Sequence, residues 1–166
     1  MGNIILNNQQ IAHKIERIAF QILEANVNEK EIIVAGIQGG GLLLAQKIID
    51  VLNKISDKKI LLCEISMDKK NPITSEIKTS LKPEQYQNKS VVIVDDVLFS
   101  GRTLIYGVNH FLNVPLKQLK TVVLVNRNFK KYPVKADFKG ISLSTSMKES
   151  VEVIFSTKGD QVQLAD

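Results

Sequence analysis

Four short stretches of the chain are continuously apolar and rich in β-branched residues. Runs of this kind are typical of strands that are buried on both faces of a parallel sheet. The predicted strands are residues 32–37, 60–65, 91–95 and 121–125. Each is followed by glycine or polar residues, which predicts that the strands end there.

Around these strands, apolar residues recur every three or four positions, which is the spacing of a helix with one buried stripe. The first such helix is predicted over residues 7–26, with Asn7 or Asn8 as its N-cap. The predicted buried stripes are Ile11, Ala12, Ile15, Ile18, Ala19, Ile22 and Leu23 in the first helix, Leu42, Leu44, Ala45, Ile48, Ile49 and Leu52 in the second, and Leu104, Ile105, Val108, Phe111 and Leu112 in the third.

Strands and helices alternate with short links, which predicts an α/β fold with a mostly parallel central sheet flanked by helices. A polar stretch at about residues 66–89 shows no sustained periodicity, and a loop of this length in a compact domain is usually either functional or disordered. Residues 136–143 and 151–155 are expected to form short antiparallel strands, a small C-terminal extension at one edge. The chain contains no linker or repeat, so residues 1–166 are expected to form a single domain.

The strand at 91–95 runs into two adjacent carboxylates, Asp95 and Asp96. Burying unpaired charge is costly, so these acids are expected in the crevice at the carboxyl ends of the strands, where open α/β sheets bind ligands. Residues 100–103 (Ser-Gly-Arg-Thr) then open a helix, whose first N–H groups lack intrahelical partners and suit a phosphate. An ordinary turn with Ser100 as an N-cap would explain the hydroxyls but not the paired acids.

A second glycine-rich turn, Gln38-Gly39-Gly40-Gly41, lies between the strand at 32–37 and the second helix. Backbone amides in such a turn can approach an anion closely. The alternative interpretation is a simple tight turn.

Composition limits the possible classes of protein. A chain of 166 residues with 44% hydrophobic content fits one domain with a substantial core. It contains no run of about 18 apolar residues, so no membrane span is expected. The single cysteine, Cys63, excludes an internal disulfide and favours a cytoplasmic location. The net charge of +5 is compatible with a polyanionic substrate or RNA, but the basic residues are mostly lysines.

Residues 91–104 resemble the phosphoribosyl pyrophosphate (PRPP) signature of type I phosphoribosyltransferases. The resemblance implies that Asp95 and Asp96 are the catalytic acids, holding the ribose hydroxyls and Mg²⁺ through water, and Mg²⁺ prefers such oxygen ligands. It implies a 5-phosphate loop of Phe99, Ser100, Gly101, Arg102 and Thr103 and a pyrophosphate loop of Gln38, Gly39, Gly40 and Gly41. It also implies that residues 66–89 form a hood over the site.

Further segments, Leu124–Arg127, Ala136–Gly140 and Thr145–Glu149, are similar to the pyrimidine operon attenuator/uracil phosphoribosyltransferase (PyrR) family. Those proteins bind RNA, and many make UMP from uracil and PRPP. Purine enzymes usually carry an acid at the position of Phe99, so hypoxanthine and guanine are disfavoured.

The PyrR resemblance also bears on the base site and on assembly. It implies base contacts by the ring of Phe138, by backbone groups near Lys139 and by Arg127. A buried core role for Phe138 stays open. The family also implies a homo-oligomer, a dimer or higher.

The chain departs from the PyrR pattern at three places. Residues 38–41 replace the family's Lys-Thr-Arg-Gly. The hood is shorter, with Met67-Asp68-Lys69-Lys70 in place of Tyr-Arg-Asp-Asp, and Asn126 replaces an aspartate. Three functions therefore stay open, ranked in this order: Mg²⁺-dependent transfer of phosphoribosyl from PRPP to uracil or a related base, a PRPP sensor with little turnover, and an RNA-binding regulator of pyrimidine genes.

Overall fold

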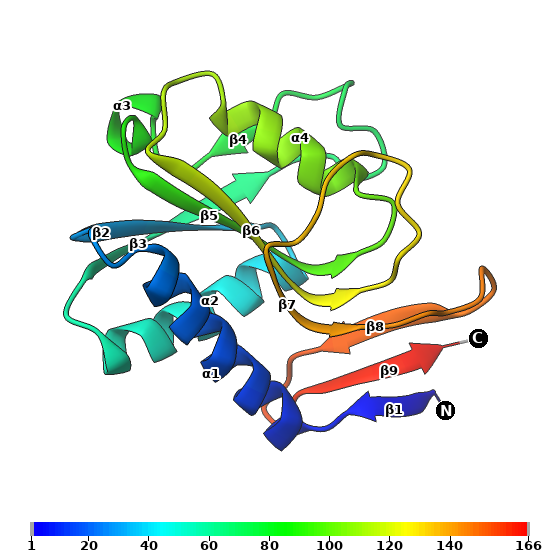
Figure 1. Ribbon diagram of the computed structural model, residues 1–166. Helices are drawn as coiled ribbons and strands as arrows, with labels where there is room; N and C mark the ends of the chain where they lie inside the picture. Colours follow the sequence, from blue (N-terminus) through cyan, green and yellow to red (C-terminus); the bar gives the residue numbers. More distant parts are fainter. Residues whose placement is uncertain (1, 166) are drawn as a thin grey trace.

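A computed structural model describes residues 2–165, which form a six-stranded central sheet, a small three-stranded sheet and four helices (Figure 1). The strand order of the central sheet is β4-β3-β2-β5-β6-β7. All neighbouring pairs are parallel except β3 and β4, which confirms the mostly parallel sheet. The strands are β2 (Glu31–Ile37), β3 (Lys59–Ser66), β4 (Lys78–Thr79), β5 (Ser90–Leu98), β6 (Gln118–Asn126) and β7 (Phe138–Ser142).

Helices cover both faces of this sheet (Figure 1). Helices α1 (Asn8–Ala25) and α2 (Gly40–Ile55) pack on one face, and α4 (Arg102–Phe111) packs on the other. Asn7 is the N-cap of α1 and forms a capping box with Gln10. The predicted stripes are largely buried, but Ala12 and Leu112 are exposed and were wrongly assigned to the core. Within residues 2–165, no helix is long and apolar enough to cross a bilayer.

The central strands are buried on both faces, as their continuous apolar runs predict. In β5, Val92 and Val94 pack into the cluster under α1 and α2, whereas Val91 and Ile93 pack into the cluster under α4. This alternation follows from the two-residue period of a strand. Strand β5 lies between β2 and β6 and is therefore held rigidly at the centre of the sheet.

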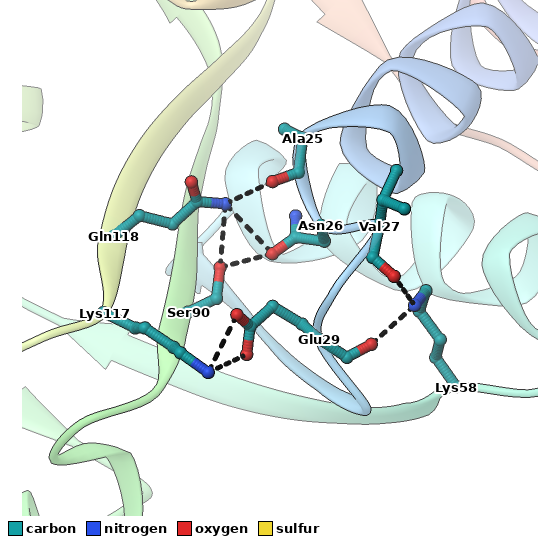
Figure 2. Close-up of polar contacts among 8 residues, drawn as sticks. All are labelled: Ala25, Asn26, Val27, Glu29, Lys58, Ser90, Lys117 and Gln118. Atoms are coloured by element: carbon teal, nitrogen blue, oxygen red, sulfur yellow. Dashed lines mark hydrogen bonds and ion pairs between the residues drawn. The ribbon is translucent and has the colours of Figure 1, made fainter.

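A buried polar cluster fixes the amino ends of β5 and β6 against the end of α1 (Figure 2). Oδ1 of Asn26 accepts hydrogen bonds from the Ser90 hydroxyl at 2.5 Å and from the Gln118 amide at 3.0 Å. The Asn26 amide donates to the carbonyl of Ile22. Buried polar groups that are fully paired in this way fix the relative position of the elements that carry them.

The C-terminal region differs from the expected antiparallel extension in one respect. Strand β7, which covers residues 138–142, pairs in parallel with β6 and belongs to the central sheet, so the antiparallel assignment for this segment was wrong. The small sheet has the order β1-β9-β8 and is antiparallel. It consists of β1 (Asn3–Leu6), β8 (Ser150–Ile154) and β9 (Gln161–Ala165), so the two ends of the chain lie on neighbouring strands (Figure 1).

The stretch at 66–89 is more ordered than its sequence suggests. It contains β4 and the one-turn helix α3 (Pro83–Tyr86), and the Tyr86 ring is fully buried at 4.8 Å from the ring of Phe111. Residues 67–77 have no helix or strand and follow directly after the carboxyl end of β3. This places them at the same edge of the sheet as the end of β5.

Candidate active site

Strand β5 carries both carboxylates to the carboxyl edge of the sheet. The strand continues past the predicted end at residue 95 and stops at Leu98, so both acids lie within it. Asp95 is buried, with 5% of its surface exposed, and Asp96 is half-buried. Oδ1 of each carboxylate accepts the backbone N–H of the next residue, at 2.9 Å from Asp96 and 2.8 Å from Val97. These bonds fix both side chains relative to the strand.

Asp95 is an unusual acid because of its surroundings. Burial, followed by the charge of Asp96, raises the pKa of Asp95 from 3.8 to about 7, and the ammonium group of Lys69 opposes this rise. The ion pair between Lys69 Nζ and Asp95 Oδ1 has a length of 3.7 Å. The carboxylate is thus poorly compensated within the protein, which favours the binding of a cation or of hydroxyl donors at this point.

The glycine turn lies directly against the carboxylates. A Cβ on Gly40 would lie 2.1 Å from Oδ2 of Asp96, and a Cβ on Gly41 would lie 2.7 Å from the carbonyl oxygen of Val94 and 3.1 Å from Oδ1 of Asp95. Gly39 has φ +95°, in the region that favours glycine. The glycines are required for this close approach, and residues 38–41 and the paired acids therefore form one site.

The loop after β5 encloses a cavity of about 160 Å³. Gly101 is the N-cap of α4 with φ +85°, and a Cβ there would lie 2.6 Å from Val134. The Ser100 hydroxyl accepts the N–H of Arg102 at 3.3 Å, so it has a capping role although it is not the N-cap. The cavity is lined by Asp95, Val97, Leu98, Phe99, Ser100, Gly101, Thr103, Leu104 and Val123. Carboxylate, hydroxyls and a helix N-terminus around one cavity suit a ligand with hydroxyl and phosphate groups.

Two of the predicted site residues lie beside this cavity without lining it. Asp96 contacts the glycine turn instead. The guanidinium group of Arg102 donates to the backbone carbonyl of Lys69 at 3.4 Å. Arg102 therefore connects the loop at residues 99–103 to the segment that follows β3.

Arg127 is buried behind Phe99. Its guanidinium group donates to the hydroxyl of Thr145 at 2.9 and 3.1 Å and to the carbonyl of Glu149 at 2.6 Å. The same group lies 4.5 Å from the centre of the Phe99 ring, and the Phe129 ring packs edge-on against Phe99 at 5.6 Å. Arg127 thus fixes the 145–149 loop and supports the half-exposed ring of Phe99 at the cavity.

Phe138 and Lys139 do not line this cavity. The Phe138 ring packs into the apolar cluster beneath α1 and α2, which also includes Val97 of the cavity wall, whereas Leu98, Leu104 and Val123 of that wall belong to the cluster on the α4 side. The backbone carbonyl of Lys139 accepts a hydrogen bond from Arg17 at 3.0 Å. Neither residue lines the cavity, and their base-binding roles stay predictions.

The sequence did not predict two residues that the structure places at the site. Lys69 reaches Asp95 from the segment after β3, and Phe129 supports Phe99. The position of Lys69 could have been predicted from the sequence. The carboxyl ends of the parallel strands β2, β3 and β5 share one edge of the sheet, and the residues that follow these strands converge there. No comparable sequence signal points to Phe129.

The donor set fits a magnesium ion that is shared with a ligand. Within residues 2–165, no group of three or more His, Cys, Asp and Glu side chains could hold a metal by itself. Mg²⁺ is commonly bound through one or two carboxylates together with substrate phosphates and water. Asp95 and Asp96 could supply those carboxylates.

Comparison with known proteins agrees with this geometry. A phosphoribosyl transferase domain matches residues 1–155. The bifunctional protein PyrR of Geobacter sulfurreducens is 33% identical over 162 residues, covering 93% of this chain and 91% of that protein. PyrR of Streptococcus thermophilus is 31% identical over 152 residues, covering 90% of this chain and 88% of that protein.

Solved structures of purine enzymes share the fold. The hypoxanthine phosphoribosyltransferase of Trypanosoma cruzi in complex with IMP superposes with a TM-score of 0.79 at 16% identity, over 97% of this chain and 92% of that one. A hypoxanthine-guanine phosphoribosyltransferase of Bacillus anthracis superposes with a TM-score of 0.71 at 22% identity, over 85% of this chain and 82% of that one. At these identities the likeness concerns the fold alone. Together, the matched domain and the relatives above 30% identity show that the chain belongs to the type I phosphoribosyltransferases and is similar to their PyrR members.

Proposed function

We propose that the protein transfers the 5-phosphoribosyl group from PRPP to a nucleobase, with release of pyrophosphate, and that uracil is the base. The observation that carries this proposal is the single site formed by Asp95, Asp96, the 99–103 loop and the 38–41 turn. Its hydroxyl-binding acids and its phosphate-binding loop match the two ends of a ribose 5-phosphate.

In this mechanism the protein positions the reactants and stabilises charge, without a covalent intermediate. Asp95 and Asp96 hold the ribose hydroxyls, and the N–H groups that open α4 hold the 5-phosphate. The 38–41 turn receives the pyrophosphate. Displacement at the anomeric carbon passes through an oxocarbenium-like state, whose positive charge the two carboxylates stabilise. Bound Mg²⁺ would neutralise charge on the pyrophosphate as it leaves.

The choice of uracil is supported by Phe99 and by the PyrR relatives. Phe99 presents a half-exposed aromatic ring at the cavity, where purine enzymes usually carry an acid. An aromatic ring can stack on a flat base but cannot accept a hydrogen bond from a purine nitrogen.

The test is nucleotide formation from PRPP and Mg²⁺ with a panel of free bases that includes uracil, cytosine, hypoxanthine, guanine and xanthine. We expect UMP from wild type and a large loss of rate in Asp95→Asn and Asp96→Asn. A purine nucleotide as the main product would overturn the choice of base. Binding of PRPP without product from any base would support the sensor function instead.

RNA binding is a second candidate, favoured by the similarity to PyrR and the net charge of +5. The arginines argue against it, because all three already bond to protein acceptors: Arg17 to Lys139 and Gly140, Arg102 to Lys69, and Arg127 to Thr145 and Glu149. The test compares the affinity of the protein for a structured leader RNA with its affinity for bulk tRNA at several salt concentrations. Equal affinities for the two RNAs would exclude a specific regulator.

We also propose self-association into a dimer or larger assembly and a cytoplasmic location. The first is supported by the family, and the second by Cys63, a buried free thiol. Light scattering across a range of concentrations measures the assembly. A mass of 18.5 kDa throughout would show a monomer.

A further inference from the structure

The pyrophosphate side of the site is short of positive charge. Residues 38–41 carry no cationic side chain, and their backbone packs directly against Asp95 and Asp96. Pyrophosphate adds further negative charge, and repulsion between like charges is strong where water is partly excluded. A cation from another part of the chain would offset this repulsion.

Lys69 provides a cation at this point. Its Nζ lies 3.7 Å from Oδ1 of Asp95 and 3.8 Å from the position that a Cβ on Gly39 would take. The ammonium group therefore lies between the buried carboxylate and the glycine turn. The Lys69 side chain is 41% exposed, so it can reach a ligand that enters from the solvent.

The backbone around Lys69 is fixed from two sides. Oδ1 of Asp68 accepts the N–H groups of Lys70 at 3.0 Å and Asn71 at 3.3 Å, which closes the turn that carries Lys69. Arg102 donates to the Lys69 carbonyl at 3.4 Å. Because Arg102 begins α4, this bond positions the ammonium group relative to the 5-phosphate loop as well as to the carboxylates.

We propose that Lys69 is the pyrophosphate-contacting cation of this protein, in place of a cation within the 38–41 turn. The inference rests on the proposed function, because pyrophosphate enters the site as part of PRPP. An ammonium group has three N–H donors, so Lys69 can donate to a pyrophosphate oxygen at the glycine turn while it still faces Asp95. Hydrogen bonds between charged groups are roughly twice as strong as neutral ones.

A simpler role for Lys69 is that of a counter-ion for Asp95. At 3.7 Å the ion pair is longer than a hydrogen bond, so the donors of the ammonium group are not committed to that carboxylate. The two roles differ in the ligands they affect. A counter-ion influences every ligand that contacts Asp95, including ribose 5-phosphate, whereas a pyrophosphate contact influences only ligands that contain pyrophosphate.

Calorimetry at constant Mg²⁺ and ionic strength separates these roles, with PRPP, inorganic pyrophosphate and ribose 5-phosphate as the three titrants. Lys69→Met keeps an unbranched side chain of similar size and removes its charge, and Lys69→Arg keeps the charge. Lys70→Met is the matched control, because Lys70 is the exposed neighbour. We expect Lys69→Met to weaken binding of PRPP and pyrophosphate by about tenfold to a hundredfold. Lys69→Arg should restore most of the affinity, and ribose 5-phosphate should bind equally to all four proteins.

Equal pyrophosphate affinity in wild type and Lys69→Met would overturn the inference and leave the proposed function standing. A matching loss for ribose 5-phosphate would also overturn it and assign Lys69 to Asp95 alone. If wild type binds neither PRPP nor pyrophosphate, the proposed function fails and the inference with it. Because the experiment measures binding, it tests the role of Lys69 even if the protein binds PRPP without turnover.

Discussion

The buried carboxyl group of Asp95 is tolerated best by the folded protein when it is protonated, because its charged form is poorly solvated at this position. The pKa of Asp95 rises from 3.8 to about 7 on folding, with burial as the largest cause. The folded protein therefore binds this proton more tightly than the unfolded chain. The contribution to stability is complete below the unfolded pKa and is lost as the pH rises through about 7.

Asp95→Asn should for this reason be more stable than wild type above neutral pH. For metal-free protein at about pH 8 we expect the free energy of unfolding to rise by on the order of 4 kcal/mol, with the difference disappearing near pH 4. Urea denaturation at several pH values measures it. Asp57→Asn, at an exposed aspartate, is the control and should show no such trend. A less stable Asp95→Asn at pH 8 would contradict the argument.

Arg127 is the residue for which the sequence and the structure suggest different roles. The resemblance places it near the base, whereas its guanidinium group is committed to Thr145 and Glu149. We expect Arg127→Met to lower the free energy of unfolding by about 2 kcal/mol, because the partly buried Thr145 hydroxyl and Glu149 carbonyl lose a charged donor. Arg17→Met is the comparison, since Arg17 bonds to backbone carbonyls from an exposed position. Unchanged stability of Arg127→Met with a raised KM for the base would instead indicate a direct base contact.

At the level of elements, the site depends on how closely α2 approaches β5. A Cβ on Gly41 would meet the backbone of Val94, which cannot rotate away. A Cβ on Gly40 would meet the carboxylate of Asp96, which can rotate away by giving up its hydrogen bond from the Val97 N–H. The two glycines therefore have different roles. Gly41 allows α2 to pack closely against β5, and Gly40 leaves room for the carboxylate of Asp96.

Alanine substitutions should separate these effects. Gly41→Ala should lower the free energy of unfolding by about 2 kcal/mol, as overpacking does. Gly40→Ala should keep the fold and reduce PRPP binding by displacing Asp96. Gly107→Ala in α4 is the control: its nearest neighbours would be 3.8 Å away, so the variant should gain about 0.5–1 kcal/mol. Thermal unfolding and PRPP calorimetry on the three variants measure both quantities. Equal stability losses in Gly40→Ala and Gly41→Ala would be inconsistent with this division.

For the whole molecule, the two ends of the chain are joined in one small sheet. Asn3 in β1 is opposite Leu164 in β9, and Val162 of β9 is fully buried in the cluster beneath α1 and α2. The residues that line the cavity belong to β5, α4, β6 and the loop between the first two. Stability and ligand binding are therefore expected to respond separately to changes in this sheet.

Val162→Ala tests this separation. Removing two buried methyl groups should lower the free energy of unfolding by about 2 kcal/mol, with PRPP affinity unchanged. Val27→Ala, at a valine that is 70% exposed, should leave both quantities unchanged. Loss of PRPP affinity in folded Val162→Ala would show that the small sheet supports the site.

The sequence by itself determined the features that depend on local pattern. β-branched runs specified the central strands, the apolar stripes and Asn7 specified α1, and the adjacent charges of Asp95 and Asp96 predicted the edge of the sheet at which the cavity lies. Periodicity, capping and the solvation of charge act over a few residues, so they can be recognised in the chain alone.

The tertiary structure decided the partners that lie far apart in the chain. It brought Lys69 to Asp95, directed Phe99 rather than Phe138 to the cavity, and paired β1 with β9. Such contacts follow from the order of the strands and from which face of the sheet each side chain meets. No local pattern encodes either of these, because both are set by the packing of the whole chain.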